Sequence, residues 1–466
     1  MIYLETFELK NKLKSAKNIY DFISIIFYYL SSQKSNRYIS DYNYFFSNNN
    51  YKLFFQQLDW QFSMFLANNF NYEKKPVSEL LKPWFELFDT ANFNIGFETF
   101  CYASLVSFDK SYSISNNKFK RVIKQGPLNN IFQDKVLFFN NSPKGYFKKI
   151  LDKNKNIAGR NRMVYNSTDL DSYLNNFHMV KKSTIDNYEP VINRYNIDFN
   201  FDDKTKIKIL PCKIDFNCNL DNKRKTFSIL YKSQNCTQQV DSIIRILKKA
   251  DDENYSIVLF PEIFLLPNTI NVLQHQLCTI KLKNIKLIFT GSGWQDRKNT
   301  AYILSANGTI LCSHKKKIPF SYYIKEKEMS FIEDIEIDNT FEFLDIEGIG
   351  RISYLICRDF LTDENKCFCG SIMESDMIFI SAFTSKTKLM LDVSNSLATN
   401  NGIATVLCNS SSAISISNNQ DLIDNEVQLE HLIGYINYPI ADGKNLKYHQ
   451  KIMPMNLSNC YNCDKC

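Results

Sequence analysis

Ile352-Ser-Tyr-Leu-Ile-Cys357-Arg358-Asp359 is a short apolar run that ends abruptly in a thiol beside two charged residues. Such a run is typical of a buried strand, and a cysteine at its end would lie where a substrate can reach it. Free cysteine also occurs as a small buried hydrophobic residue. This segment alone therefore does not decide between a reactive and a structural thiol.

Two upstream segments have the same form and favour a reactive thiol. Ser256-Ile-Val-Leu-Phe260-Pro261-Glu262 is an apolar run that delivers one carboxylate, and Gly308-Thr-Ile-Leu-Cys-Ser-His314 leads into Lys315–Lys317. A carboxylate base, a cation and a thiol together supply what attack on a carbon–nitrogen bond needs: a proton acceptor, a stabiliser of negative charge and a nucleophile. We predict that Glu262, one of the lysines and Cys357 act together.

At these residues the chain resembles the nitrilase superfamily of carbon–nitrogen hydrolases, whose Glu-Lys-Cys centre follows the same order. The similarity covers roughly residues 205–440. Further landmarks occur in the family's order: Thr290-Gly-Ser292, Asn299-Thr-Ala-Tyr-Ile-Leu304, Asn307-Gly308, Ile378-Phe-Ile-Ser-Ala-Phe383 and Val406-Leu-Cys-Asn409. The resemblance implies an α/β fold built as a four-layer α-β-β-α sandwich, and it implies self-association into a homo-oligomer.

The resemblance also suggests roles for individual residues. Counting from Gly308 assigns the catalytic lysine to Lys316 and counting back from Pro319 assigns it to Lys315; we prefer Lys316. A second family glutamate, which helps to position the lysine, corresponds to Glu326 or Glu328, and the spacing leaves both open. We predict that Glu328 and Arg358 contact the substrate.

The expected activity is attack of Cys357 on an amide or nitrile, with Glu262 as base, Lys316 as stabiliser of the tetrahedral intermediate and a thioester as the product of the first half-reaction. The thioester would pass to water, in a hydrolase, or to an amine, in an acyltransferase. The alternative is a sensor or interaction protein that keeps the architecture without turnover. No Gly-rich phosphate loop is present, so we predict no nucleotide cofactor.

The composition is compatible with a folded protein that resides in a reducing compartment of the cell. The 466 residues are 44% hydrophobic and 14% aromatic, which excludes general disorder. The net charge of +7 has no concentrated basic block, so we do not predict a nucleic-acid partner. Thirteen cysteines form no small-domain disulfide framework, and a thiol nucleophile needs reducing conditions, so we predict a cytoplasmic protein. The apolar segment Phe22–Leu30 is too short to span a bilayer, and we expect no membrane association.

Apolar periodicity predicts three regions. Residues 1–200 read as a mainly helical domain of unknown role, although Val136–Phe139 has the pattern of a strand. Residues 201–445 alternate short strands with helices such as Val240–Ala250, and form the nitrilase-like domain. Residues 446–466 are a tail whose cysteines have metal-ligand spacing: Cys460, Cys463 and Cys466. A fourth zinc ligand would have to come from Cys367, Cys369 or His449. Since the three tail cysteines do not complete a structural site by themselves, we predict no metal.

The segments Lys316-x-x-Pro319-Phe320 and Ile356-Cys-Arg-Asp359 are also similar to the nitrilase-like portion that some bacterial antiviral reverse transcriptases carry. This resemblance suggests a role in antiviral defence. Asn200-Phe-Asp202-Asp203 lacks the aromatic residue two positions before the aspartate pair that a polymerase motif needs. We therefore do not predict polymerisation.

Overall fold

The computed structural model describes residues 2–16, 19–31, 33, 37–48, 51–68, 81–91, 96–116, 124–125, 136–140, 177–181, 188–195, 197, 199, 201, 205–213, 215–233, 235–324, 328–416, 432–442 and 445–454. The chain divides into two compact units. The first, called the helical unit, comprises Met1–Asn141 and Arg162–Asn187. The second, called the sheet unit, comprises Ser142–Asn161 and Tyr188–Cys466.

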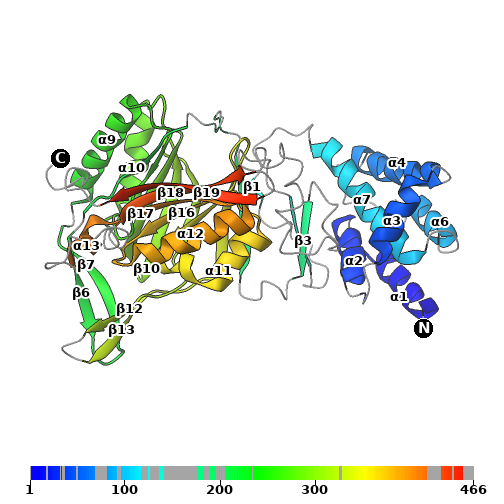
Figure 1. Ribbon diagram of the computed structural model, residues 1–466, viewed down its shortest axis with the longest axis horizontal. Coiled ribbons are helices and arrows are strands. Elements are labelled where there is room, and N and C mark those ends of the chain that lie inside the picture. Colours follow the sequence, from blue (N-terminus) through cyan, green and yellow to red (C-terminus); the bar gives the residue numbers. More distant parts are fainter. Residues whose placement is uncertain are drawn as a thin grey trace. The chain divides into compact units, whose positions relative to one another are not determined.

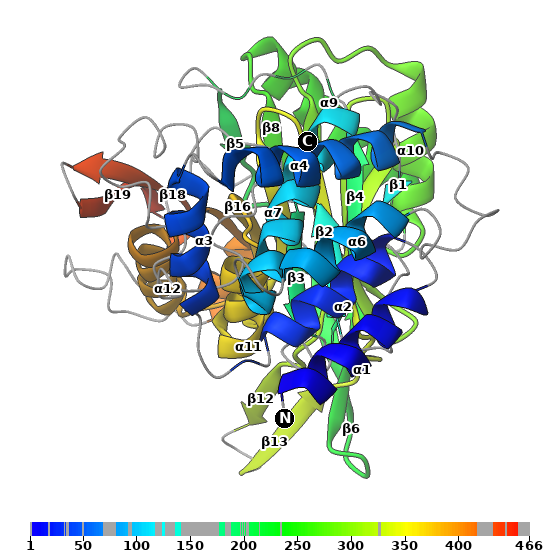
Figure 2. The same ribbon diagram turned by 90° about the vertical axis from the view of Figure 1, so that its right-hand side faces the viewer.

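The helical unit confirms the helices expected near the start of the chain. Its elements are α1 (Ile2–Lys14), α2 (Ile19–Ser31), α3 (Arg37–Ser47), α4 (Lys52–Asn68), α6 (Lys82–Ala91), α7 (Phe97–Asn116), β1 (Lys124–Gln125), β2 (Val136–Asn140) and β3 (Phe177–Lys181). Strand β2 covers the predicted strand and pairs antiparallel with β3. Helix α7 packs along α4, and α2 and α3 also contact it (Figure 2).

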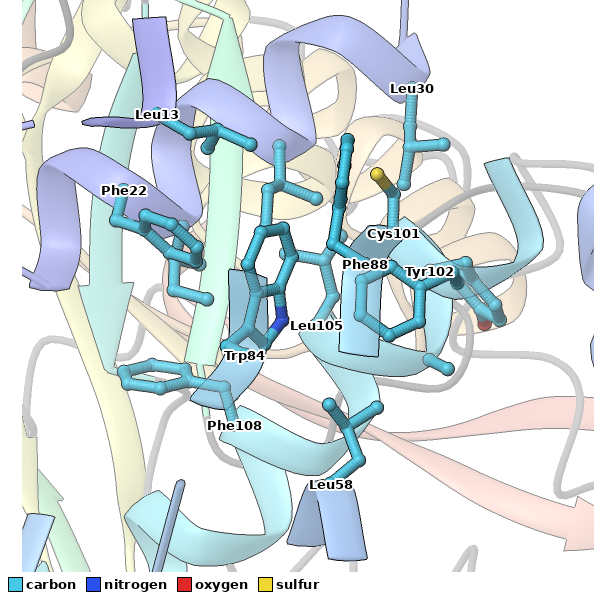
Figure 3. Packing of buried hydrophobic residues seen from close by; sticks show 14 of the residues in the cluster. Leu13, Phe22, Leu30, Leu58, Trp84, Phe88, Cys101, Tyr102, Leu105 and Phe108 are labelled. Carbon is cyan, nitrogen blue, oxygen red and sulfur yellow. The ribbon is translucent and has the colours of Figure 1, made fainter. Parts of the chain in front are cut away.

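Aromatic side chains fill the centre of the helical unit (Figure 3). Trp84 is completely buried, its indole N–H donates to Ser104 Oγ at 2.9 Å, and its ring meets Phe22 edge-on with centroids 4.8 Å apart. The apolar run Phe22–Leu30 lies within α2 and faces this core. None of the helices in the described part of the chain combines the length and the apolar character that crossing a bilayer requires.

The sheet unit alternates strands and helices. Its elements are β4 (Glu189–Tyr195), β5 (Ile207–Ile209), β6 (Phe216–Asp221), β7 (Thr226–Tyr231), α9 (Cys236–Asp252), β8 (Ile257–Leu259), α10 (Thr269–Thr279), β9 (Leu287–Gln295), β10 (Lys298–Ser305), β11 (Ile310–Lys315), β12 (Ser321–Ile324), β13 (Met329–Glu333), β14 (Thr340–Ile346), β15 (Gly350–Ile356), a 3₁₀ helix (Cys357–Leu361), α11 (Asp363–Cys367), a π-helix (Phe368–Ile372), β16 (Met377–Ala382), α12 (Thr387–Asn401), β17 (Ala404–Asn409), α13 (Ser411–Ile416), β18 (Leu432–Asp442) and β19 (Asn445–Pro454).

Two sheets pack face to face in this unit (Figure 1). Of the strands that belong to the sheet unit, one sheet has the order β4-β14-β15-β16-β17-β18-β19, and the other has the order β11-β10-β9-β8-β5. Strands β15, β16 and β17 run parallel and are buried along their whole length, as apolar strands covered on both faces are. Phe289 on β9 stacks on Phe379 of β16 with ring centroids 3.8 Å apart, which joins the two sheets.

Helices cover the outer faces of both sheets. Apolar residues of α9 and α10, such as Leu247 and Leu273, form one core with Val258 and Ile288 of the smaller sheet. Helix α12 packs on β17, β18 and β19 of the larger sheet. The order across the sheet unit is therefore helices, sheet, sheet, helices. The chain as a whole has a mixed α/β fold with a helical region at its amino-terminal end.

A third sheet, with the order β12-β13-β7-β6, extends away from the other two (Figures 1 and 2). Its inner face carries Phe227, Ile229, Tyr231 and Phe331, which pack in one hydrophobic cluster with Ile263. This sheet was not distinguished in the sequence, because its strands are short and carry aromatic residues on both faces.

The sheet unit begins earlier than the predicted boundary near residue 200. Strand β4 pairs in parallel with β14 from Glu189 to Tyr195, so it belongs to the larger sheet. Arg194 contacts Asp345 at 3.2 Å, and Asp345 also binds the buried Arg351. Backbone pairing and a shared carboxylate thus join residues that are about 150 positions apart in sequence.

We predict that Trp84→Ala lowers the free energy of unfolding of the helical unit by about 3–5 kcal/mol, because it empties the centre of the core. Trp60→Ala is the matched control, since Trp60 is 63% exposed, and it should change stability by less than about 0.5 kcal/mol. Urea unfolding followed by far-ultraviolet circular dichroism measures both. Equal effects of the two substitutions would contradict the packing described here.

Candidate active site

Three loops that follow strand ends bring Glu262, Lys316 and Cys357 into one cluster. Strand β8 is followed by Phe260-Pro261-Glu262, β11 ends one residue before Lys316, and β15 ends one residue before Cys357. All three side chains are buried, with exposed fractions of 3%, 3% and 5%. Ionisable side chains are almost never fully buried without a partner, so their pairing defines the site.

Lys316 lies between two carboxylates. Its Nζ donates to Glu262 Oε1 at 2.8 Å and to Glu333 Oε2 at 2.6 Å. Burial lowers the pKa of Lys316 but the negative charges of Glu262 and Glu333 outweigh it, so the pKa is raised and the lysine stays charged. An ammonium group has three N–H donors, and these two contacts leave one for a further acceptor.

Glu333 is the second glutamate of the site, where the sequence left Glu326 or Glu328 open. It is buried, accepts from Lys316, and accepts the backbone N–H of Phe320 at 3.0 Å. Glu328 is exposed at a turn with φ of 50°, away from these contacts, and Glu326 lies outside the described residues. The difference arises because β13 carries its charged residue inward at its last position, five residues beyond the predicted one.

Asn299 is a site residue that the sequence analysis named only as a landmark. Its Nδ2 donates to Glu262 Oε1 at 3.1 Å and to Glu333 Oε1 at 3.2 Å. The backbone of Lys316 donates to the Asn299 carbonyl at 2.8 Å. The alternation of β10 offered a signal, since Asn299, Ala301 and Ile303 are alternate buried positions and a polar residue in that series faces inward.

The thiol and Glu262 influence each other's protonation. Burial raises the pKa of Cys357, and the negative charge of Glu262 raises it further, so the sulfur is a thiol at neutral pH. Burial also raises the pKa of Glu262, while Lys316 opposes that change. Each of the two side chains shifts the pKa of the other in the direction that keeps Glu262 a carboxylate and Cys357 a thiol. This arrangement suits proton transfer from sulfur to oxygen.

Cys357 occupies a sharp turn between β15 and the 3₁₀ helix. Its φ is 47°, a left-handed conformation that non-glycine residues seldom adopt and that clusters at functional sites. Its Sγ lies 3.8 Å from the carbonyl oxygen of Phe383, the first residue after β16. Arg358, predicted to contact substrate, is exposed and donates its Nη1 to the Pro319 carbonyl at 3.1 Å.

The residues next to Lys316 in sequence bind other carboxylates and do not contact Glu262. His314 is buried, and its Nε2 lies 2.8 Å from Asp359 Oδ2; burial lowers the pKa of His314, so the ring is neutral and donates this proton. Asp359 also accepts the backbone N–H groups of Lys317 and Ile318. Lys315 is 40% exposed and pairs with Asp338. Of the lysine run, Lys316 alone contacts Glu262 among the described residues.

Gly291 holds the turn that carries Glu262. Its φ is 72°, and a Cβ there would lie 2.2 Å from the Pro261 carbonyl oxygen, so a side chain is excluded. The backbone N–H of Ser292 donates to the same Pro261 carbonyl at 3.2 Å. Tyr354 accepts the Gly291 N–H at 3.0 Å, which ties this turn to β15.

Within the described residues no three His, Cys, Asp or Glu side chains lie together as a metal site would require. The tail cysteines Cys460, Cys463 and Cys466 lie outside the described residues.

No family model matches this sequence. No curated protein matches it either. Among solved structures, it is similar to the amidase from Nesterenkonia sp. AN1, with 17% identity, a TM-score of 0.30, and coverage of 38% of this chain and 73% of that chain. A mutant of that amidase with an acetamide moiety added at its active-site cysteine gives 16% identity, a TM-score of 0.30, and coverage of 38% and 71%. That amidase is described as a member of the nitrilase superfamily.

The glutamine-dependent NAD+ synthetase from Acinetobacter baumannii is similar at 16% identity, with a TM-score of 0.31. The match covers 38% of this chain and 36% of that one. Similarities at this level do not establish a shared activity.

We predict that Lys316→Met lowers the free energy of unfolding by about 3–5 kcal/mol, because it leaves two buried carboxylates without a counter-charge. Lys315→Met is the matched control, since Lys315 is 40% exposed, and should cost less than about 1 kcal/mol. Chemical denaturation of both variants measures the difference. If Lys315→Met were the more damaging change, Lys316 would not be the charge that holds the cluster.

Proposed function

We propose that this protein is a carbon–nitrogen hydrolase of the nitrilase type, acting on an amide or nitrile through Cys357. The observation that supports it most is the meeting of one base, one cation and one thiol in a buried cluster, with Lys316 bonded to Glu262 at 2.8 Å. The helix-sheet-sheet-helix order of the sheet unit agrees with the four-layer sandwich that the sequence resemblance implies. The roles below follow from the contacts of each residue.

In the first half-reaction on an amide, Glu262 takes the thiol proton while Cys357 Sγ bonds to the substrate carbonyl carbon. The carbonyl oxygen becomes an oxyanion, which the third N–H of Lys316 and the backbone N–H of Arg358 stabilise. The carbon–nitrogen bond then breaks, and the nitrogen leaves as ammonia after taking the proton held by Glu262. A thioester on Cys357 remains.

In the second half-reaction Glu262 accepts a proton from water as the water oxygen attacks the thioester. The carbon–sulfur bond breaks, the acid leaves, and the sulfur takes the proton back from Glu262. An amine in place of water would give acyl transfer by the same steps. Glu333 and Asn299 do not enter these steps; they hold Glu262 and Lys316 at the required separation.

Two broader expectations stay predictions of the sequence resemblance: self-association, and a role in antiviral defence. A sensor without turnover is the competing function. A sensor would keep the buried Glu262–Lys316 pair for stability alone. Covalent chemistry at Cys357 therefore distinguishes a hydrolase from a sensor.

We expect the wild-type protein to release ammonia from members of an amide and nitrile panel, and Cys357→Ala to release none. Glu333→Gln should lower kcat/KM by about 10²-fold, since it removes a charge that positions Lys316. Glu328→Gln is the control, because that carboxylate is exposed, and should leave kcat/KM unchanged. Ammonia release that persists in Cys357→Ala would sink the proposal.

The pH dependence follows from Glu262. The base must be ionised, and burial raises its pKa above the ordinary 4.5. Activity should therefore fall as pH decreases through a midpoint above 4.5, the ordinary value for glutamate. Asn299→Ala removes a hydrogen bond to the carboxylate and should move this midpoint of kcat/KM to higher pH. A midpoint that moves down in Asn299→Ala would contradict the assignment of Glu262.

A further inference from the structure

One hydrophobic cluster lies at the reactive groups and is not used by the steps above. It joins the inner face of the β12-β13-β7-β6 sheet to the loops after β8 and β16. We call five of its members the apolar wall: Phe216, Ile263, Leu266, Trp294 and Phe383. Phe216, Trp294 and Phe383 are half-buried, so solvent reaches them although Cys357 is 5% exposed.

We propose that the apolar wall is the subsite for the acyl group, and that the substrates are amides or nitriles of uncharged, apolar carboxylic acids. The proposal rests on the proposed function and specifies its substrate class. Three contacts and the charge of the site support it.

The first contact places the wall at the sulfur. The carbonyl oxygen of Phe383 lies 3.8 Å from Cys357 Sγ, and the Phe383 ring meets the Phe216 ring with centroids 5.3 Å apart. Phe216 is on β6 opposite Tyr231 of β7, on the inner face of its sheet. An acyl group bonded to the sulfur and directed toward Phe383 would meet these two rings.

The second contact places the wall beside the base. Trp294 on β9 is the cross-strand partner of Asn299 on β10, so the two side chains lie on one face, and Asn299 donates to Glu262. The buried indole Nε1 of Trp294 has no hydrogen-bond partner among the described residues. Buried donors in folded proteins are almost always paired, so this N–H is available to one acceptor atom of a bound substrate.

The third observation concerns Ile263, the member of the apolar wall that directly follows Glu262 in sequence. Its φ of 57° puts a β-branched residue in the left-handed region, which is a genuine outlier. The backbone N–H of Ile263 donates to Ser292 Oγ at 3.2 Å, and its side chain is buried in the cluster. A glycine would adopt this turn without strain, so the isoleucine side chain is held at the wall at a cost in backbone strain, a pattern that clusters at functional sites.

The charge of the site selects against acidic substrates. Glu262 and Glu333 carry two negative charges and Lys316 one positive charge, so the paired cluster has an excess of one negative charge. Arg358 is the cation nearest in sequence to Cys357, and it is exposed and bonded to the Pro319 carbonyl. A carboxylate on the acyl group would therefore meet apolar side chains and a negative cluster, which is unfavourable.

The test compares kcat/KM of the wild-type protein, by ammonia release, for phenylacetamide, acetamide and the monoamide of succinic acid. We expect phenylacetamide to exceed the anionic monoamide by at least about tenfold, the scale that apolar contacts give. Equal values, or a preference for the anion, would overturn the subsite and leave the proposed function standing. No ammonia from any of the three would overturn both.

Variants separate a binding role from a structural one. Phe216→Ala should reduce kcat/KM for phenylacetamide about tenfold, mainly through KM, and affect acetamide less; Phe216→Leu, which keeps the apolar volume, should lie between. Tyr323→Ala is the matched control, because Tyr323 is on the opposite face and 57% exposed. An equal loss for both substrates in the Phe216 variants would overturn the assignment.

Discussion

The site depends on one buried ammonium group shared by two carboxylates. Burying three charges costs several kcal/mol for each ion unless they pair closely, and Lys316 meets both partners at 2.8 Å or less. The three residues come from different parts of the chain: Glu262 from the loop after β8, Lys316 from the end of β11 and Glu333 from the end of β13. The electrostatic requirement therefore fixes the third sheet to the other two, since Glu333 is on β13.

Backbone geometry is the second constraint. Cys357 and Ile263 both have left-handed φ values, one at the nucleophile and one beside the base. Gly291 allows the close approach that keeps the Glu262 turn in place, and Ser381 Oγ donates to the Phe260 carbonyl at 2.6 Å. Unusual backbone conformations and a buried hydrogen bond between the two sheets thus position Glu262 and Cys357.

Much of this was predictable because the chemistry lies at the ends of apolar runs. A run such as Ile352–Ile356 must be buried, so the polar residue after it falls at a sheet edge where other strand ends meet. The helices were predictable because apolar residues recur at helical spacing. Leu58 and Phe62, for example, are one turn apart and are both completely buried.

The unpredicted parts depend on contacts that are distant in sequence. Spacing from Lys316 could not show that Glu333 is its partner, although Phe331 and Glu333 alternate as buried positions on β13. Asn299 joins two carboxylates that are 37 and 34 residues away. Strand β4 belongs to the sheet unit because it pairs with β14, and no pattern in the sequence near β4 predicts that pairing.

The central claim is that Cys357 carries the acyl group while Glu262 and Lys316 serve it. The most direct measurement is peptide mass mapping of the protein quenched in acid during turnover of an amide. A peptide that contains Cys357 and has gained the acyl mass is the predicted result. Ammonia release with the acyl group on another residue, or with no acylated peptide at any quench time, would contradict it.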